Sequence, residues 1–304
     1  MHRDPLSGEA MTHGCEVLAG GVAVITGAGA GIGAGLARRA AHAGMRVVLA
    51  DIDLERAEGL AHELAAITEV MPIKVDVARP EALDALAATV HQRWGEVRLL
   101  INNAGVETVG YSWEIPAERW EATLDINLHG VIHGVRAFAP RMIASGKPAW
   151  IANLASVGAF GQMPLQTAYI VTKHAVQAFS ECLYLEMEMA GAPIRVSSII
   201  PGMVKTRIFE DAEGGSGEAA ASHKQAMRKA MAADGMELDA ACERILNRIA
   251  AGDFWISTQP RMTDMIVSDR VTFLTERTRP SISAGLKPLF ARQETQPRSP
   301  SAAE

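Results

Sequence analysis

The sequence VAVITGAGAGIG, residues 22–33, joins a short apolar run to a turn rich in glycine. Gly27, Gly31 and Gly33 permit a tight turn, a close approach of backbone amides to a pyrophosphate, and the start of a helix whose N-terminus favours negative charge. An alanine-rich helix with a loose start has a similar composition, so the surrounding pattern must decide. The next apolar run ends in Asp51, about 20 residues on, where a carboxylate can accept both ribose hydroxyls of an adenosine. The stretch therefore predicts a strand, turn and helix that bind a dinucleotide.

Apolar runs alternate with alanine- and leucine-rich stretches of helical length along the chain. The runs are continuous, which is typical of parallel strands covered on both faces and joined by right-handed crossovers. We therefore predict an α/β fold, a single doubly wound Rossmann-type domain with a seven-stranded parallel sheet in the order 3-2-1-4-5-6-7 and helices on both faces. The expected strands are residues 22–26, 46–50, 70–75, 99–102, 150–155, 194–200 and 254–258, and the clearest expected helices are 80–94, 117–146 and 167–190.

Pro72 interrupts the third apolar run. A proline cannot donate a hydrogen bond to a strand ladder and is tolerated on an edge strand, which is where the predicted order puts this run. We expect residues 20–258 to form the domain, with a substrate loop at 203–235 and a C-terminal helical extension of the same domain at 259–290. The polar ends, residues 1–19 and 291–304, are expected to be disordered tails.

The composition limits the partners of this protein. With 304 residues and 48% hydrophobic content the chain can bury a large core. The formal net charge is −6 and the basic residues are scattered, which argues against a nucleic acid or an anionic membrane as partner. No signal-peptide core and no run of 18 apolar residues occurs, so we expect a cytoplasmic protein that binds a small molecule. No histidine has a neighbour spacing that suits a metal, so none is expected.

The segment TAYIVTKHAV, residues 167–176, sets Tyr169 and Lys173 one helical turn apart on one helix face. Such a pair also arises by chance as a surface pair. Beside a nucleotide site it has a chemical meaning, because hydride transfer to a carbonyl leaves negative charge on oxygen and requires a proton donor. A nearby ammonium and an oxidised, cationic nicotinamide lower the pKa of a phenol by favouring phenolate.

Six motifs occur in order between residues 20 and 207: TGAGAGIG, NNAG at 102–105, Asn127 in LDINLHG, Ser156 in NLASVGAF, the Tyr169/Lys173 pair and PGMVKT at 201–206. Together they resemble the short-chain dehydrogenase/reductase family in its shorter, single-domain branch. Ser156 lies thirteen positions before Tyr169, as in the pattern of that family. The glycine spacing differs from that of the longer branch, which holds sugar epimerases and dehydratases.

The resemblance implies a role for each matching residue. Tyr169 is the expected proton donor, Ser156 would hydrogen-bond the substrate oxygen, and Lys173 would tune Tyr169 and hold the nicotinamide ribose. Asn127 would hold a water that links Lys173 to solvent. From the residues alone, Ser156 also suits a turn cap, Asn127 a solvated helix position and Asp76 a turn. The residues expected to bind the cofactor, NAD, are Gly27, Ala30, Gly31, Ile32, Gly33, Asp51, Asp76, Val77, Asn103, Ala104, Gly105, Tyr169, Lys173, Pro201, Gly202, Val204 and Thr206.

NAD is expected over NADP because Asp51 repels a 2′-phosphate and no arginine is expected in place to pair with that phosphate. Ala30 stands before Gly31 and Ile52 follows Asp51, and neither can pair with a phosphate. Arg38 and Arg39 fall inside the first crossover helix, where we expect them to be solvated. The expected substrate wall is apolar and suits a bulky secondary alcohol or ketone better than a sugar. Its candidates are Val106, Tyr111, Trp113, Val157, Leu165, Ile208 and Phe209, together with Phe160, Gln162, Met163 and Met203, which we select as substrate-contacting residues.

The C-terminal end departs from the family, because nothing there resembles the glycine-rich tail with which many members form tetramers. We expect a homodimer or homotetramer built on the helices at 117–146 and 167–190. The predicted function is an NAD-dependent oxidoreductase that interconverts a secondary alcohol and a ketone, on an alicyclic, terpenoid, steroid or aryl substrate. The alternative is a non-catalytic NAD-binding regulatory or scaffold protein of the same fold.

Overall fold

The computed structural model describes residues 14–282 and 287–290, and its centre is a parallel sheet of seven strands. The strand order is β3-β2-β1-β4-β6-β7-β9, which confirms the predicted order. Pro72 lies in β3, which pairs with β2 and forms one edge of the sheet. The strands are β1 (Val22–Thr26), β2 (Arg46–Asp51), β3 (Val70–Lys74), β4 (Leu99–Asn102), β6 (Ala149–Leu154), β7 (Ile194–Ile200) and β9 (Trp255–Ser257).

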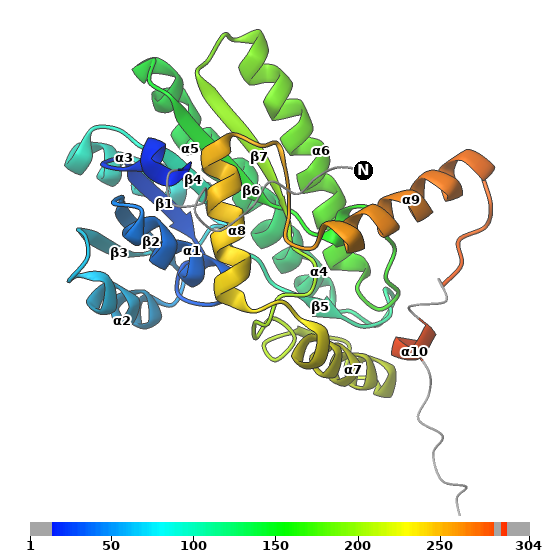
Figure 1. The fold of residues 1–304 in the computed structure, drawn as a ribbon. Coiled ribbons are helices and arrows are strands. Elements are labelled where there is room, and N and C mark those ends of the chain that lie inside the picture. Colours follow the sequence, from blue (N-terminus) through cyan, green and yellow to red (C-terminus); the bar gives the residue numbers. More distant parts are fainter. Residues whose placement is uncertain (1–13, 283–286, 291–304) are drawn as a thin grey trace, which may run out of the picture.

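Helices cover both faces of this sheet (Figure 1). One core joins the sheet to α1 (Gly31–His42), α2 (Leu54–Leu64) and α8 (Leu238–Ala251). The other joins it to α3 (Pro80–Trp94), α5 (Gly130–Ser145) and α6 (Thr167–Met189). Val24 and Ile25 are neighbours in β1 and are fully buried in different cores. Burial of both side chains explains why the strands are continuously apolar.

The predicted helix at 117–146 is divided in the structure. It consists of α4 (Ala117–Leu124), the π-helical segment η2 (Asp125–His129) and α5. Asn127 lies in the middle of η2 and is 1% exposed. A π turn is rare and is often found where a helix must present a side chain out of regular phase. The sequence analysis did not foresee this change of helix type.

A second, two-stranded sheet was not predicted. It pairs β5 (Thr108–Val109) with β8 (Glu213–Gly214), and so ties the chain after β4 to the expected substrate loop. That loop also holds α7 (Glu218–Asp234), and a turn of 3-10 helix, η3 (Val157–Ala159), follows β6. Val109, Phe209 and Met227 belong to one buried cluster, so β5, the loop and α7 pack as a unit.

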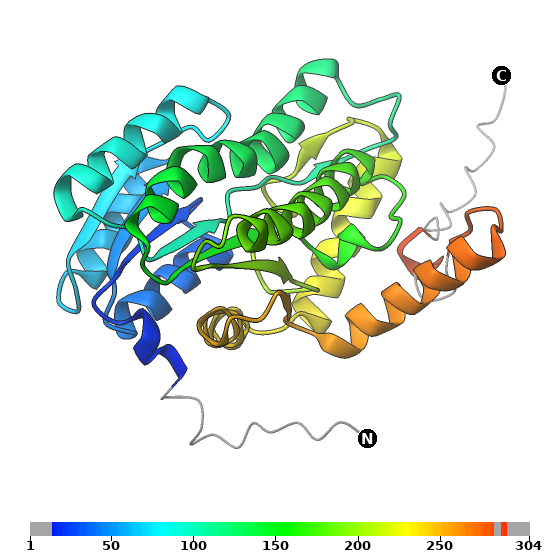
Figure 2. The same ribbon diagram turned by 90° about the horizontal axis from the view of Figure 1, so that it is seen from above.

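The C-terminal part consists of two helices, of which the second contacts α7 of the expected substrate loop. Helix α9 (Pro260–Glu276) extends away from the body of the molecule (Figure 2), and Thr263 is the residue that it buries. Short helix α10 (Lys287–Phe290) packs against α7, where the rings of Phe290 and His223 stack with centroids 5.2 Å apart. The extension is therefore helical, but most of α9 contributes little to the core.

The N-terminal boundary lies earlier than predicted. Residues Gly14–Leu18 form a 3-10 helix, η1, whose Leu18 is fully buried among α8 and the sheet. The Cys15 Sγ donates to the Asn247 Oδ1 at 3.0 Å. The expected tail 1–19 is therefore wrong for residues 14–19, because Leu18 adds apolar contact to the core. Residues 1–13 and the other expected tail, 291–304, lie outside the described residues. None of the described helices has the length and hydropathy needed to cross a membrane.

Candidate active site

The turn after β1 and the loop after β4 are joined by hydrogen bonds. The Thr26 Oγ1 accepts from the amides of Asn103 and Ala104, at 3.0 and 3.2 Å. In return the Asn103 Nδ2 donates to the carbonyls of Thr26 and Gly27, at 2.8 and 3.0 Å. Because parallel strands end at the same edge of a sheet, these contacts fix two predicted motifs, TGAGAGIG and NNAG, against each other.

The glycines of the first motif lie where a side chain has no space. A Cβ on Gly33 would be 2.1 Å from the Gly27 carbonyl oxygen and 2.5 Å from the Asn103 Nδ2. Gly27 has φ +63°, a conformation that favours glycine. Ala30 precedes α1 without a capping side chain, and the first turn of α1 has no acidic residue. The helix therefore offers unfilled amide donors and a positive dipole end to an anion.

Asp51 ends β2 and is hydrogen-bonded to the backbone. Its Oδ2 accepts from the Gly29 amide at 2.7 Å and its Oδ1 from the Asp53 amide at 2.9 Å. An arginine does stand near this carboxylate, contrary to the expectation that none is placed there: the Arg56 Cβ would lie 3.0 Å from a Cβ on Gly29. Arg56 forms an ion pair with Asp53, with Nε and Oδ2 3.0 Å apart. The sequence analysis missed Arg56 because it lies one turn into α2.

Arg38 and Arg39, in contrast, are held by partners away from this edge. Arg38 pairs with Glu63 at 2.7 Å, and Arg39 pairs with Asp239. Both side chains have acidic partners, and at 41% and 28% exposed they also remain in contact with solvent, as expected.

The remaining predicted cofactor residues follow β3 and β7. The Asp76 Oδ1 accepts from the Ala78 amide at 3.0 Å, which is the turn contact weighed as its alternative role. Val77 packs against Gly130, where a Cβ would be 2.9 Å from the Val77 Cγ2. Thr206 lies beside the glycine turn, since a Cβ on Gly31 would be 3.6 Å from its Cγ2. The segment after β7, which contains Thr206, therefore lies close to the glycine-rich turn of the TGAGAGIG motif.

Three other members of the predicted cofactor set are held in place by hydrogen bonds or strand pairing. The Pro201 carbonyl accepts from the Val157 amide at 3.0 Å, and the Gly202 amide donates to the Thr258 Oγ1 at 3.1 Å. Val204 is buried and forms a β-bridge with Met236. Ile32 and Gly105 also lie at this edge, in the first turn of α1 and in the loop after β4.

Ser156, Tyr169 and Lys173 lie together at the start of α6. Ser156 and Tyr169 share a side-chain hydrogen bond, and the Ser156 Oγ also accepts from the Gly158 amide at 3.0 Å. The Lys173 Nζ lies 5.4 Å from the centroid of the Tyr169 ring and donates to the Leu154 carbonyl at 2.7 Å. Ser156 is therefore a turn cap and a partner of Tyr169 at once.

Asn127 uses its side chain within the fold. Its Oδ1 accepts from the Val106 amide at 2.7 Å, and its Nδ2 donates to the Val106 carbonyl at 2.9 Å and to the Thr172 Oγ1 at 3.2 Å. Between Asn127 and Lys173 stands Gly105, where a Cβ would be 3.3 Å from the Asn127 Oδ1 and 3.8 Å from the Lys173 Nζ. Asn127 therefore links the NNAG loop to α6.

Burial dominates the electrostatics of this group. It raises the pKa of Tyr169 above its ordinary value, the charge of Glu107 adds to the rise, and the hydrogen bond with Ser156 opposes it. Burial also lowers the pKa of Lys173 to about 8, which the charge of Glu107 opposes. The expectation that Lys173 lowers the pKa of Tyr169 is thus not met by the chain alone: burial and the charge of Glu107 raise that pKa, and the opposing effect comes from Ser156.

Glu107 is a residue of this site that the sequence analysis missed. It follows the NNAG motif by two positions, is 3% exposed, and accepts from the Thr108 amide at 3.0 Å through its Oε1. Burial raises the pKa of its carboxyl group well above the usual range. A glutamate in a loop suggests a solvated residue, and the only available signal was its distance of two positions from a recognised motif.

The four residues selected as substrate contacts lie in the segments that follow β6 and β7, and they differ in burial. The Phe160 ring lies 5.4 Å from the ring of Trp255 on edge strand β9, and Gln162 is exposed. Met163 and Met203 are half-buried. Leu165 and Phe209, which were candidates for the wall, belong instead to the buried cluster with α7, and the stacked rings of Tyr111 and Trp113 are exposed.

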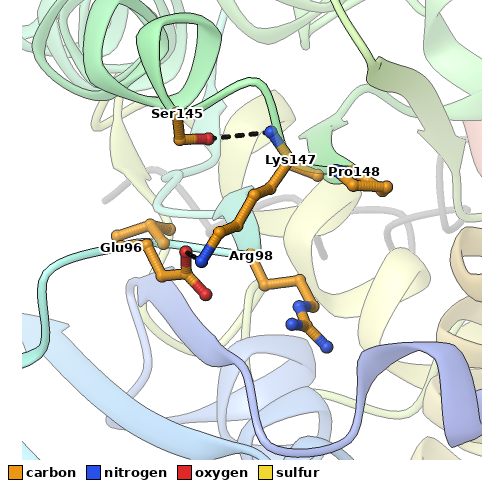
Figure 3. Close-up of a pocket in the computed structure, with 7 residues that line it drawn as sticks. Glu96, Arg98, Ser145, Lys147 and Pro148 are labelled. Carbon is orange, nitrogen blue, oxygen red and sulfur yellow. Dashed lines mark hydrogen bonds and ion pairs between the residues drawn. The ribbon is translucent and has the colours of Figure 1, made fainter.

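A small pocket lies away from this group (Figure 3). Its residues precede β4 and β6, and its rim carries the ion pair between Lys147 and Glu96, 2.6 Å apart. The amide of Lys147 donates to the Ser145 Oγ at 3.2 Å. The pocket therefore belongs to the amino ends of the strands, opposite the predicted motifs. Among the residues that the structure describes, no three His, Cys, Asp or Glu side chains are grouped as metal ligands.

Comparison with known proteins agrees with this arrangement. The family model described as short chain dehydrogenase matches residues 21–215, which is more than half of the chain. The chain belongs to the short-chain dehydrogenase/reductase family. The predicted resemblance is thereby confirmed, and the protein is assigned to a family of oxidoreductases.

Relatives of known name and structure cover most of the chain. It is 32% identical over 274 residues to 1-deoxy-11-beta-hydroxypentalenate dehydrogenase of Streptomyces avermitilis, covering 86% of this chain and 96% of the relative. The protein of the same name from Streptomyces exfoliatus is 37% identical over 191 residues, covering 62% and 69%. A short-chain dehydrogenase/reductase of Burkholderia phymatum, solved in complex with NAD, has a TM-score of 0.84 and 32% identity, covering 88% and 98%.

The glycine turn provides a first test of the site. Gly33→Ala places a Cβ against the Gly27 carbonyl and the Asn103 side chain, and overpacking of this kind costs about 1–3 kcal/mol. We expect the midpoint of thermal unfolding to fall by roughly 2–10 °C. Gly59→Ala in α2 is the matched control, because no atom lies within 4 Å of its Cβ position, and it should leave the midpoint unchanged or raise it. An equal effect of the two substitutions would contradict the close approach.

Proposed function

We propose that this protein is an NAD-dependent oxidoreductase that interconverts a bulky apolar secondary alcohol and the corresponding ketone. One observation carries the proposal: Ser156, Tyr169 and Lys173 are held together at the carboxyl end of the sheet, beside the glycine turn. Membership of an oxidoreductase family supports the same reaction class.

The glycine turn fits a dinucleotide in this proposal. The amide donors at the start of α1 suit a pyrophosphate, because Ala30 supplies no side-chain cap and Gly31 has no side chain to cover them. Asp51 lies at the end of β2 to meet the adenosine ribose, and Thr206 flanks the turn. When bound there, NAD would supply the hydride acceptor or donor that the protein itself lacks.

The residues of the chain supply the proton transfer. In ketone reduction the Tyr169 hydroxyl donates a proton to the substrate oxygen, and in alcohol oxidation its phenolate accepts one. The Ser156 hydroxyl would orient that oxygen. Lys173 would hold the nicotinamide ribose, and together with the positive charge of the oxidised cofactor it would favour the phenolate of Tyr169. Burial favours the neutral phenol, so the resting protein is prepared for proton donation. Asn127 holds the loop that faces Lys173, and its proposed role is to order the water path to solvent.

The substrate class rests on the side chains around the proposed site. Phe160, Met163 and Met203 offer apolar contacts, and Gln162 is the polar candidate. Two relatives are named as dehydrogenases of 1-deoxy-11-beta-hydroxypentalenate, which supports a terpenoid-like alcohol within the proposed range. The non-catalytic alternative is less favoured, because a protein that only binds NAD has no need to bury a lysine beside a tyrosine at this point.

The proposed proton donor is tested by Tyr169→Phe, which keeps the ring and removes the hydroxyl group. We expect turnover to fall by at least ~100-fold, the lower end for general acid–base catalysis. Turnover would be followed by absorbance of the reduced cofactor on a panel of terpenoid and alicyclic alcohols, and NAD affinity by titration. Tyr184→Phe is the matched control and should retain activity. More than a tenth of wild-type turnover in Tyr169→Phe would refute the assignment.

The proposed preference for NAD rests on the charge of Asp51. A 2′-phosphate placed against it brings like charges together at a cost of several kcal/mol, of which about 2 remain after screening, a roughly 30-fold preference. Comparison of kcat/KM with NAD and NADP on one alcohol measures it. Asp51→Asn should reduce the ratio, and Arg56→Ala in that background should restore part of it if Arg56 then meets the phosphate. Equal efficiency of the wild-type protein with both cofactors would contradict the proposal.

We also propose a homodimer in which α6 contacts its symmetry mate. Val176, Leu183 and Met187 are buried within the chain, whereas Val171 and Leu185 are 46% and 57% exposed on the same helix. Burial of this second apolar face requires a partner. Sedimentation at micromolar concentration should give a dimer, and Leu185→Glu should shift it toward monomer. Ile67→Glu, at a residue 46% exposed beyond α2, is the control. A 32.4 kDa wild-type monomer would be the contrary result.

A further inference from the structure

Helix α9 has an apolar face that the core does not use. Met262, Ile266 and Phe273 recur at helical spacing along it, and each of them is half-buried. Thr263 is the residue of this helix that the structure buries. Large apolar side chains that line one helix face and stay partly exposed indicate a contact other than core packing. The neighbours of this face show which contact it suits.

The start of α9 is fixed to the end of the central sheet. The Thr263 Oγ1 lies 2.7 Å from the Ser257 Oγ of β9. Thr258 follows that strand: its Oγ1 accepts from the Gly202 amide at 3.1 Å, and its carbonyl accepts from the Arg244 Nη1 at 2.6 Å. Gly202 belongs to the PGMVKT motif after β7. Helix α9 therefore begins against a segment that we propose to bind the cofactor.

Two glycines allow α9 to approach the segments that follow β6 and β7. A Cβ on Gly161 would be 3.2 Å from the Ile266 Cγ2, and a Cβ on Gly202 would be 3.0 Å from the Met262 Sδ. Met262 and Ile266 are four positions apart, so they lie on the same side of the helix. One helix face thus spans both segments, and these segments contain the four residues selected as substrate contacts.

The segment after β6 also reaches the proposed proton donor. A Cβ on Gly158 of η3 would be 3.4 Å from the Ser156 Oγ and 3.7 Å from the Tyr169 Cε1. The same turn is bonded to the segment after β7, because the Val157 amide donates to the Pro201 carbonyl at 3.0 Å. Helix α9 contacts η3 as well. A short stretch of chain therefore connects the apolar face of α9 to the residues proposed to move a proton.

We propose that the first half of α9 is a wall of the substrate site, with Met262 and Ile266 as specificity-determining residues for a bulky apolar alcohol. The inference rests on the proposed function and deepens it, because it assigns part of the substrate contact to the C-terminal extension. A methionine suits this position, since its flexible thioether adapts to irregular apolar shapes. The wall ends before the last turns of α9, where the Arg270 guanidinium lies 5.1 Å from the centroid of the Phe273 ring.

The substitution Ile266→Ala shortens the side chain that approaches Gly161. We expect kcat/KM for cyclooctanol, relative to that for isopropanol, to fall by roughly 10-fold, the lower end for discrimination by an apolar pocket. Most of the change should be in KM, because the groups proposed to move the proton are unaltered. Met265→Ala is the matched control, at a residue 59% exposed on the same helix, and should keep the wild-type ratio. An unchanged ratio in folded Ile266→Ala would count against the wall.

Methyl NMR of the wild-type chain tests the contact without turnover. Protein labelled with ¹³C at the methionine methyl groups would be titrated with cyclooctanol, with and without NADH, which does not react with an alcohol. The signals would be assigned by their loss in Met262→Leu and in the corresponding single substitutions. We expect Met262 to shift with the same midpoint as Met163 and Met203. Met265 should not shift.

The outcomes of this titration separate the inference from the proposed function. Shifts at Met163 and Met203 without a shift at Met262 would overturn the inference and leave the proposed function standing. A shift at Met262 in a protein that oxidises no alcohol would support the wall while the proposed reaction fails. No shift at any of the three would overturn the inference. A Met262 signal that responds to dilution of the protein and not to cyclooctanol would also overturn it, because this face would then contact a second copy of the chain.

Discussion

The hydrogen bonds between Thr26 and Asn103 are the contacts on which the rest of the site depends. They join the ends of β1 and β4, strands that pair in parallel from Ala23 and Leu99 onward. The glycine turn proposed to bind a dinucleotide and the loop that leads to Glu107 are therefore joined directly. Asn127 extends the connection to α6 through Val106 and Thr172. A chain of short polar contacts thus relates the nucleotide edge of the sheet to the residues proposed to move a proton.

The same burial that orders these residues works against their charges. Lys173 loses proton affinity because it is removed from water, and Tyr169 and Glu107 hold their protons more strongly for the same reason. Each of them is partly compensated: Lys173 by the Leu154 carbonyl, Tyr169 by Ser156, and Glu107 by the Thr108 amide. The site is consequently a place where burial shifts the pKa values of three ionisable groups from their ordinary values, as is typical of functional sites.

Most of the central sheet was predictable, because strands such as β1 are buried on both faces and have an unbroken apolar sequence. The motifs were predictable because glycine, asparagine and the Tyr169/Lys173 pair occur at fixed spacing. What escaped prediction has no such periodicity. The two-residue strands β5 and β8 are too short to show a pattern, and the burial of Glu107 results from tertiary packing that its position in a loop does not reveal. Arg56 reaches the end of β2 only through the packing of α2, and Leu18 joins the core only through α8.

The π-helical segment at Asp125–His129 has a consequence for how the chain tolerates change in length. A π turn holds one residue more than an α turn, as if a residue had been inserted into a regular helix. In an α-helix each residue advances the side-chain direction by about 100°, from 3.6 residues per turn. Loss of one residue before Asn127 would restore a regular helix and rotate its amide away from Val106. We therefore expect this chain to tolerate a deletion between α4 and α5 poorly, and an insertion at the exposed loop tip at Gly146 much better.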